Sequence, residues 1–219
     1  MEIKDISGIV LFALEGAKTI ADVVLAAVNA RKSLDGANLY GANLYGANLY
    51  GANLSRANLS RANLSRASLY GANLYGASLC GASLSRASLD GASLCGASLD
   101  GASLDGASLD GANLYGANLY GASLDGASLD GKKVDSMRVF NGMYRHTVYA
   151  VLFQDGQRWI RMGCLWMSLD EWEKIGIRNS NLTEYPDDGS DKCEERVAAF
   201  EFAKNTVLRM KLRSTYDRP

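Results

Sequence analysis

One five-residue pattern, repeated without interruption from residue 37 to residue 131, constrains the fold of this chain more than any other feature. Each copy reads Ala, then Asn or Ser, then Leu, then a variable residue, then Gly or Arg, and it occurs nineteen times. The variable residue is Tyr, Asp, Ser or Cys, whereas Ala and Leu never change. The pattern therefore predicts a constant core that carries a variable surface.

A period of five fits neither a helix nor a flat strand. Five helical residues advance by about 500°, so successive leucines would not form an apolar stripe. In a flat strand the next Ala, five residues on, would point to the opposite face. The chain must therefore turn once in each pentad, where Gly supplies the backbone conformation that a tight turn favours. Stacked coils would then pair the polar groups of their backbones.

The pentads closely resemble those of the pentapeptide-repeat proteins, as in residues 37–41 (Ala-Asn-Leu-Tyr-Gly) and 97–101 (Ala-Ser-Leu-Asp-Gly). This resemblance implies a mainly β fold, namely a right-handed four-sided β-helix of about five coils with Leu and Ala inside. Leucine-rich repeats and hexapeptide or nonapeptide β-helices have other periods, which the sequence lacks.

The chain divides into three predicted parts. Residues 1–36 predict an N-terminal cap, with a hairpin around Ser7 and Gly8 and an amphipathic helix from about residue 18 to residue 31. Residues 37–131 form the repeat array. Residues 132–219 predict a small α+β domain that covers the other end. Its elements are a hairpin of residues 144–153 and 158–162, a short helix opened by the capping box of Ser168 and Glu171, and a longer helix that begins at Asp191.

The variable residues predict two different surface patches. With four pentads per turn, residues twenty apart stack in one column. Tyr and Arg lie mostly toward the N-terminal half of the array and Asp toward the C-terminal half. The predicted aromatic and basic patch consists of Tyr45, Tyr50, Tyr70, Arg66 and Arg86. The predicted acidic patch consists of Asp90, Asp105, Asp110, Asp125 and Asp130.

No motif indicates an enzyme, a cofactor or a metal site. His146 is the only histidine, and no third group completes a catalytic pair with Cys164. The acidic segment 186–191 misses the alternate spacing of a calcium-binding EF-hand loop, and a turn into a helix N-cap explains the same residues. The cysteines lack metal-ligand spacing, which indicates reduced thiols in a cytoplasm. We therefore expect no catalytic residues, no metal ligands and no cofactor.

The combination of cap, array and C-terminal segment also resembles uncharacterised proteins of tailed phages and prophages. Gly163-Cys164, the segment 168–172 and the segment 186–204 carry this likeness, which implies an accessory factor in the cytoplasm of a bacterial host. The apolar run from residue 9 to residue 14 is too short to span a membrane, and the first residues do not form a secretory leader. No membrane association is expected.

Two functions remain open. A non-catalytic interaction or scaffold protein would present Tyr and Arg to a protein partner, because these residues are favoured at interfaces. The alternative follows from a resemblance to quinolone-resistance pentapeptide proteins that bind DNA gyrase: the acidic half would mimic DNA and inhibit gyrase or a defence nuclease.

Charge favours the first function. The array has six Asp against four Arg, a net charge of −2, whereas duplex DNA of the same length of about 23 Å carries about 13 charges. We expect a protein partner and no direct binding of nucleic acid. A homodimer is left open.

Overall fold

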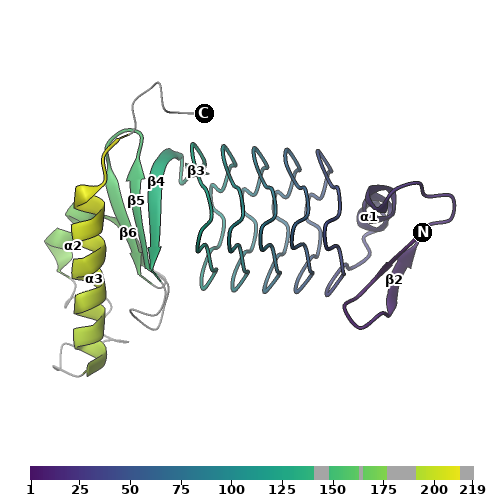
Figure 1. Ribbon diagram of the computed structural model, residues 1–219, viewed down its shortest axis with the longest axis horizontal. Coiled ribbons are helices and arrows are strands. Elements are labelled where there is room, and N and C mark those ends of the chain that lie inside the picture. Colours follow the sequence, from purple (N-terminus) through teal and green to yellow (C-terminus); the bar gives the residue numbers. More distant parts are fainter. Residues whose placement is uncertain (141–147, 163–164, 177–190, 213–219) are drawn as a thin grey trace. The chain divides into compact units, whose positions relative to one another are not determined.

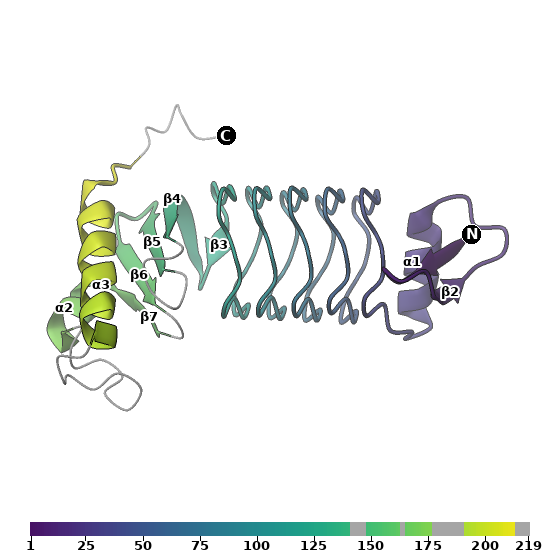
Figure 2. The same ribbon diagram turned by 60° about the horizontal axis from the view of Figure 1, so that its bottom comes forward.

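The computed structural model describes residues 1–140, 148–162, 165–176 and 191–212, and the chain falls into two compact units, Met1–Gly131 and Lys132–Pro219. The first unit contains the N-terminal segment and the stacked coils of the array (Figure 1). The second contains an antiparallel sheet and two helices. Helix α3 lies beside this sheet in both ribbon views (Figure 2).

The N-terminal segment contains the predicted hairpin and helix, both shorter than expected. Strands β1 (Glu2–Lys4) and β2 (Val10–Ala13) pair antiparallel. Helix α1 (Ile20–Asn29) begins after Thr19, whose hydroxyl accepts a hydrogen bond from the backbone N–H of Asp22. Its apolar side is buried at Val23, Val24 and Ala27. The capping box thus starts the helix two residues later than its apolar pattern suggests.

The array is a β-helix in which each coil pairs with the next at a separation of twenty residues. Parallel bridges join Asn38 to Asn58 and Asn58 to Ser78 in one column, and the other columns repeat this register as far as Ser108 and Ser128. The leucine of every pentad is buried, which confirms the inward position predicted for it. Most of the alanines are buried too, although Ala112 and Ala122 are only partly so. Strand β3 (Ser128–Leu129) belongs to the last coil.

The second unit is built on an antiparallel sheet in which successive strands are neighbours. Its strands are β4 (Lys132–Phe140), β5 (Val148–Phe153), β6 (Arg158–Met162) and β7 (Leu165–Ser168). Helix α2 (Leu169–Ile175) follows β7 at once, and helix α3 (Asp191–Arg209) completes the unit.

The core of this unit lies between the sheet and the two helices. Phe200, Ala203 and Val207 of α3 pack with Val148, Ile160 and other buried residues of the strands. Trp172 of α2 is fully buried, and its indole N–H donates a 2.8 Å hydrogen bond to the carbonyl oxygen of Ile160. This bond satisfies the one polar atom of a large apolar side chain.

Several predicted elements of the second unit are confirmed, and two strands were missed. The hairpin across Asp155 and Gly156 is present as β5 and β6, and Ser168 and Glu171 form the capping box of α2. The longer helix begins at Asp191, as expected. Residues 144–147 of the predicted strand lie outside the described residues. Strands β4 and β7 were not predicted from the sequence pattern.

Candidate functional site

The last residue of each pentad has a left-handed backbone conformation. In the second complete pentad, for example, Gly46 has a φ of 64°, and the N–H of Ala47 donates a 3.1 Å hydrogen bond to the carbonyl of Leu44. A positive φ at the third position alone is the geometry of a type II turn, for which glycine is favoured. The side chain at this corner points away from the buried Ala and Leu columns.

Every arginine of the first unit occupies such a left-handed position. Their φ values lie between 54° and 60°, at Arg31, Arg56, Arg61, Arg66 and Arg86. A residue with a Cβ atom is strained in this region by roughly 1–2 kcal/mol. Sequence reasoning missed this shared conformation, although the alternation of Gly and Arg at one pentad position was a signal for it.

Three of these arginines contact the side chain that lies 21 residues earlier in the sequence. The guanidinium of Arg61 lies 5.8 Å from the ring centroid of Tyr40, and that of Arg66 lies 5.7 Å from the ring of Tyr45. These are cation–π distances. Arg56 instead forms a salt bridge with Asp35, in which its Nε donates a 3.0 Å hydrogen bond. The bond to Arg56 lowers the pKa of Asp35.

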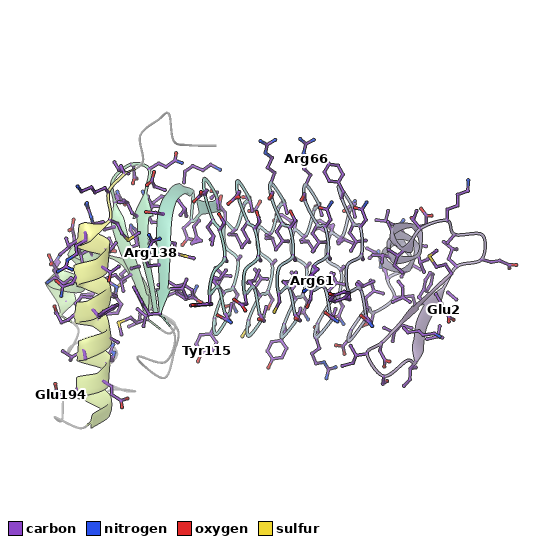
Figure 3. The ribbon with its side chains drawn as sticks, viewed as in Figure 1. Glu2, Arg61, Arg66, Tyr115, Arg138 and Glu194 are labelled. Carbon is purple, nitrogen blue, oxygen red and sulfur yellow. The ribbon has the colours of Figure 1, made fainter. Side chains whose placement is uncertain are left out.

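The tyrosines of the predicted patch form an ordered and exposed aromatic surface. The rings of Tyr50 and Tyr70 are stacked, with centroids 5.5 Å apart and planes 1° from parallel. They remain 65% and 50% exposed. Arg66 extends outward from the array, on the opposite side from Tyr115 (Figure 3). The structure thus brings together Tyr50 with Tyr70, and Tyr45 with Arg66.

Arg86 stands apart from the other members of the patch. The residue 21 positions before it is Ser65, so the contact that Arg66 makes with a ring is not available to it. Its Cγ lies 3.4 Å from the place where a Cβ atom on Gly106 would stand. Arg86 therefore lies along the corner of the next coil.

The aspartates of the predicted acidic patch are hydrogen-bonded within the array. Asp90 Oδ1 accepts a 3.1 Å bond from the backbone N–H of Asp110, and its other oxygen accepts one from Ser88. Asp110 in turn accepts bonds from the N–H of Gly131 and the hydroxyl of Ser128. Both carboxylates are half-buried and accept hydrogen bonds from the coil that follows them.

The neighbouring acidic column repeats this arrangement. Asp105 accepts bonds from the hydroxyls of Ser103 and Ser123 and, at 3.1 Å, from the backbone N–H of Asp125. Asp125 is half-buried, whereas Asp130 is exposed and has a φ of 50°. The two acidic columns thus stabilise the stacking of the coils as well as carrying charge.

A second sequence signal explains these bonds. All six aspartates of the array follow a Ser by two positions, whereas six of the seven tyrosines follow an Asn. The Asn side chain accepts a hydrogen bond from the N–H two residues on, as Asn48 does from Tyr50 at 3.2 Å. Serine has no side-chain carbonyl to accept such a bond. The N–H groups of Asp110 and Asp125 instead donate to the carboxylates of Asp90 and Asp105 in the preceding coil.

His146, Cys164 and residues 186–190 lie outside the described residues. Within the described ranges, no group of three or more His, Cys, Asp or Glu side chains could hold a metal ion. Of the helices that the structure describes, none is both long and apolar enough to cross a membrane.

The geometry of the first unit defines a class of protein, the β-helical repeat solenoids. The family model for pentapeptide repeats matches residues 33–61, 62–101 and 96–131 in eight copies. The repeat array, residues 33–131, belongs to the pentapeptide-repeat family. No curated protein sequence matches it.

Three solved structures illustrate the likeness. A pentapeptide repeat protein from the Arabidopsis thaliana thylakoid lumen is 31% identical, with 44% of this chain and 63% of that chain covered and a TM-score of 0.34. Rfr23 from the cyanobacterium Cyanothece 51142 is 40% identical, with 42% and 58% covered and a TM-score of 0.29. A Nostoc PCC 7120 pentapeptide repeat protein is 37% identical, with 51% and 79% covered and a TM-score of 0.27. The chain spans less than two thirds of the first two proteins.

Proposed function

We propose that this protein is a non-catalytic interaction protein whose array presents a rigid aromatic and cationic surface to a protein partner. The observation that carries the proposal is the stacked and exposed pair of Tyr50 and Tyr70. Tyrosine and arginine, together with tryptophan, are enriched at binding hot spots. Side chains that are already held in place lose little conformational entropy when they bind.

The arginines add to this preorganisation. Arg66 lies over the ring of Tyr45, which fixes a cation beside an aromatic face before any partner arrives. Tyr45, Tyr50 and Tyr70 are all exposed, so the rings are accessible. The patch thus combines tyrosine with arginine, two residues that are enriched at protein interfaces.

The shape of the scaffold forms part of the proposal. We propose a right-handed four-sided β-helix of about five coils, capped by residues 1–36 at one end and by residues 132–219 at the other. The twenty-residue register and a turn in every pentad support four sides. The cellular setting in this proposal is a phage or prophage accessory factor in the cytoplasm of a bacterial host, without direct binding of nucleic acid and with the homodimer left open.

The DNA-mimic alternative, inhibition of gyrase or a defence nuclease through Asp90, Asp105, Asp110, Asp125 and Asp130, has less support. A mimic needs carboxylates that project outward with the spacing of phosphates. Asp90, Asp105 and Asp110 instead direct their carboxylates to backbone and hydroxyl donors of the array. Their charge remains, but their geometry is set by the stacking of the coils.

Affinity capture from a bacterial lysate, followed by mass spectrometry, tests the proposed function. The double variant Tyr45→Ser/Tyr70→Ser is expected to lose the captured partner, whereas the matched variant Tyr115→Ser/Tyr120→Ser, on other columns, retains it. Tyr50 is left unchanged so that the adjoining groove stays intact. Equal capture by both variants would refute the aromatic patch. Loss on changing Asp105, Asp110, Asp125 and Asp130 together to Asn would favour the mimic instead.

A further inference from the structure

A groove with a volume of about 690 Å³ lies between the end of helix α1 and the first coil of the array. One wall is formed by the last turn of the helix and the segment that follows it, including Val28, Arg31 and Lys32. The other is formed by the coil, including Asn48 and Tyr50. Both walls belong to the first unit, and every residue that lines the groove is described.

The coil wall of this groove is an open edge of the β-helix. One coil further on, the backbone groups equivalent to this edge are paired. The N–H of Ser68 donates to the carbonyl of Ala47, and the carbonyl of Ser68 accepts a hydrogen bond from the N–H of Leu49. The carbonyl of Tyr70 accepts one from the N–H of Gly51. The corresponding groups twenty residues earlier are the N–H and carbonyl of Asn48 and the carbonyl of Tyr50. Within residues 1–131, all of which are described, none of these three groups has a protein partner.

An open edge of this kind is a template for an added strand. An extended segment in the groove could accept a hydrogen bond from Asn48 and donate to the carbonyls of Asn48 and Tyr50. It would then repeat the bonds that each coil makes with the next. The exposed ring of Tyr50 stands beside the same edge and offers apolar area to a side chain of the segment.

The helix wall determines the charge of the occupant. Arg31 and Lys32 are exposed, and no acidic side chain lines the groove. Neither cation forms a salt bridge with any described residue. Two unpaired cations along one wall therefore complement carboxylates that project from one side of an extended chain.

Arg31 occupies its position at a cost in backbone strain. The N–H of Arg31 donates to Val28 and the N–H of Lys32 to Ala27, which is the Schellman pattern of a helix end. The residue at the position of Arg31 is usually glycine, because its φ, here 54°, is left-handed. Strain of this kind gathers at functional sites. The cations also complement the carbonyl end of α1, so the test must read binding and not only stability.

We propose that this groove binds an extended acidic segment of a partner protein, which pairs with the free edge at Asn48 and Tyr50 and places its carboxylates on Arg31 and Lys32. The proposal adds a second site to the protein-binding role proposed above. The two sites share Tyr50, which lies in the Tyr70 column, but only the groove uses Arg31 and Lys32 and only the patch uses Tyr45 and Tyr70. Variants of these unshared residues therefore let each proposal fail alone.

Fluorescence anisotropy with the full-length protein tests it. The probe is a short labelled peptide in which Glu alternates with Val. The first comparison peptide has Lys in place of Glu, and the second has the Glu sequence with N-methylated amides on alternate residues. The Glu peptide is expected to bind, and the other two at least about tenfold more weakly. Absence of binding, equal binding of the Lys peptide or equal binding of the N-methylated peptide would each overturn the proposal.

Matched variants locate the site. Arg31→Gly/Lys32→Ser is expected to weaken binding of the Glu peptide by about tenfold or more, since it removes both cations. Arg61→Gly/Lys18→Ser makes the same charge change outside both the groove and the aromatic patch and should bind within about twofold of the wild type. Tyr50→Ser keeps both cations and is expected to weaken binding of the Glu peptide as well. It replaces the Arg31→Gly/Lys32→Ser variant as the test if that variant does not fold. Unchanged binding by the folded groove variants overturns the assignment.

Discussion

The arginines of the first unit show how a single residue can trade stability for a surface property. Four of them take the left-handed corner that glycine occupies elsewhere in the array, and Arg31 takes the same backbone conformation just after helix α1. The corner carries a cation outward, and where a Tyr lies 21 residues earlier it also fixes that cation over a ring. The backbone strain of these corners is the cost of a positively charged N-terminal half.

Arg86 allows this cost to be measured, because the structure gives it no ring or acidic partner. Arg86→Gly is expected to raise the free energy of unfolding by about 0.5–1 kcal/mol, since glycine adopts the left-handed corner without strain but also loses more entropy on folding. Chemical denaturation followed by circular dichroism gives the value.

Gly91→Ala is the matched reverse change. A Cβ atom on Gly91 would have no atom within 4 Å, and its φ is 65°, so only the backbone conformation is penalised. A loss of about 1 kcal/mol is expected. If Arg86→Gly destabilised the protein while Gly91→Ala did not, the strain argument would fail.

At the scale of an element, helix α1 depends on one ionised carboxylate at its start. Asp22 accepts hydrogen bonds from the backbone N–H groups of Thr19 and Lys18, and these bonds lower the pKa of its carboxyl group. A depressed pKa in the folded state means that the stabilisation is present above the unfolded pKa of about 3.9 and is lost as the pH falls through the folded value.

The variant Asp22→Asn separates this contribution from the rest of the acid response. The wild type is expected to lose more stability than the variant between about pH 6 and about pH 2.5, because only the wild type loses an ionised cap. Thermal unfolding followed by circular dichroism at both pH values measures the difference. Parallel pH dependence of the two proteins would show that the cap does not contribute.

The elements that sequence predicted are those defined by neighbours along the chain. A pentad turns because of its own Gly or Arg, the β5–β6 hairpin because of Asp155 and Gly156, and α2 because of Ser168 and Glu171. Strand β4 has no simple alternation, since Asp135 is buried beside Val134, and it exists through its pairing with β5. Strand β7 has only four residues and lies at the edge of the sheet, where it is defined by its pairing with β6.

The candidate site divides in the same way. The stacking of Tyr50 on Tyr70 follows from a register of twenty residues, and that register could be inferred from the repeat. The carboxylate of Asp90 accepts a hydrogen bond from the N–H of Asp110 because Ser108, unlike an Asn, has no side-chain carbonyl that could accept it. That outcome depends on side-chain chemistry across two coils, which the repeat pattern alone does not contain.

At the scale of the whole molecule, the two units have separate cores and separate spectroscopic probes. All three tryptophans lie in residues 132–219, whereas the array is a tyrosine-containing β-helix. Leu84→Ala is expected to cost about 2–5 kcal/mol in the first unit, because Leu84 is fully buried. If the units unfold independently, the far-ultraviolet circular dichroism transition shifts while the tryptophan fluorescence transition stays in place.

Val207→Ala supplies the reciprocal test, since Val207 is fully buried in the core of the second unit. It is expected to shift the fluorescence transition, with the dichroism of the array unchanged. A joint shift of both signals in both variants would show that the units unfold as one.

The pairing of Ser with Asp bears on how such an array could change in length during evolution. A side chain at the variable position meets the second residue of a pentad eighteen residues on, as Asp110 meets Ser128. If twenty residues were duplicated in tandem, each variable residue would meet a copy of the residue two places before itself. Every Asp of the array follows a Ser by two positions. A newly duplicated coil would therefore already contain a Ser hydroxyl for each Asp carboxylate to bind. Such an array could lengthen by whole coils without further mutations to satisfy its carboxylates.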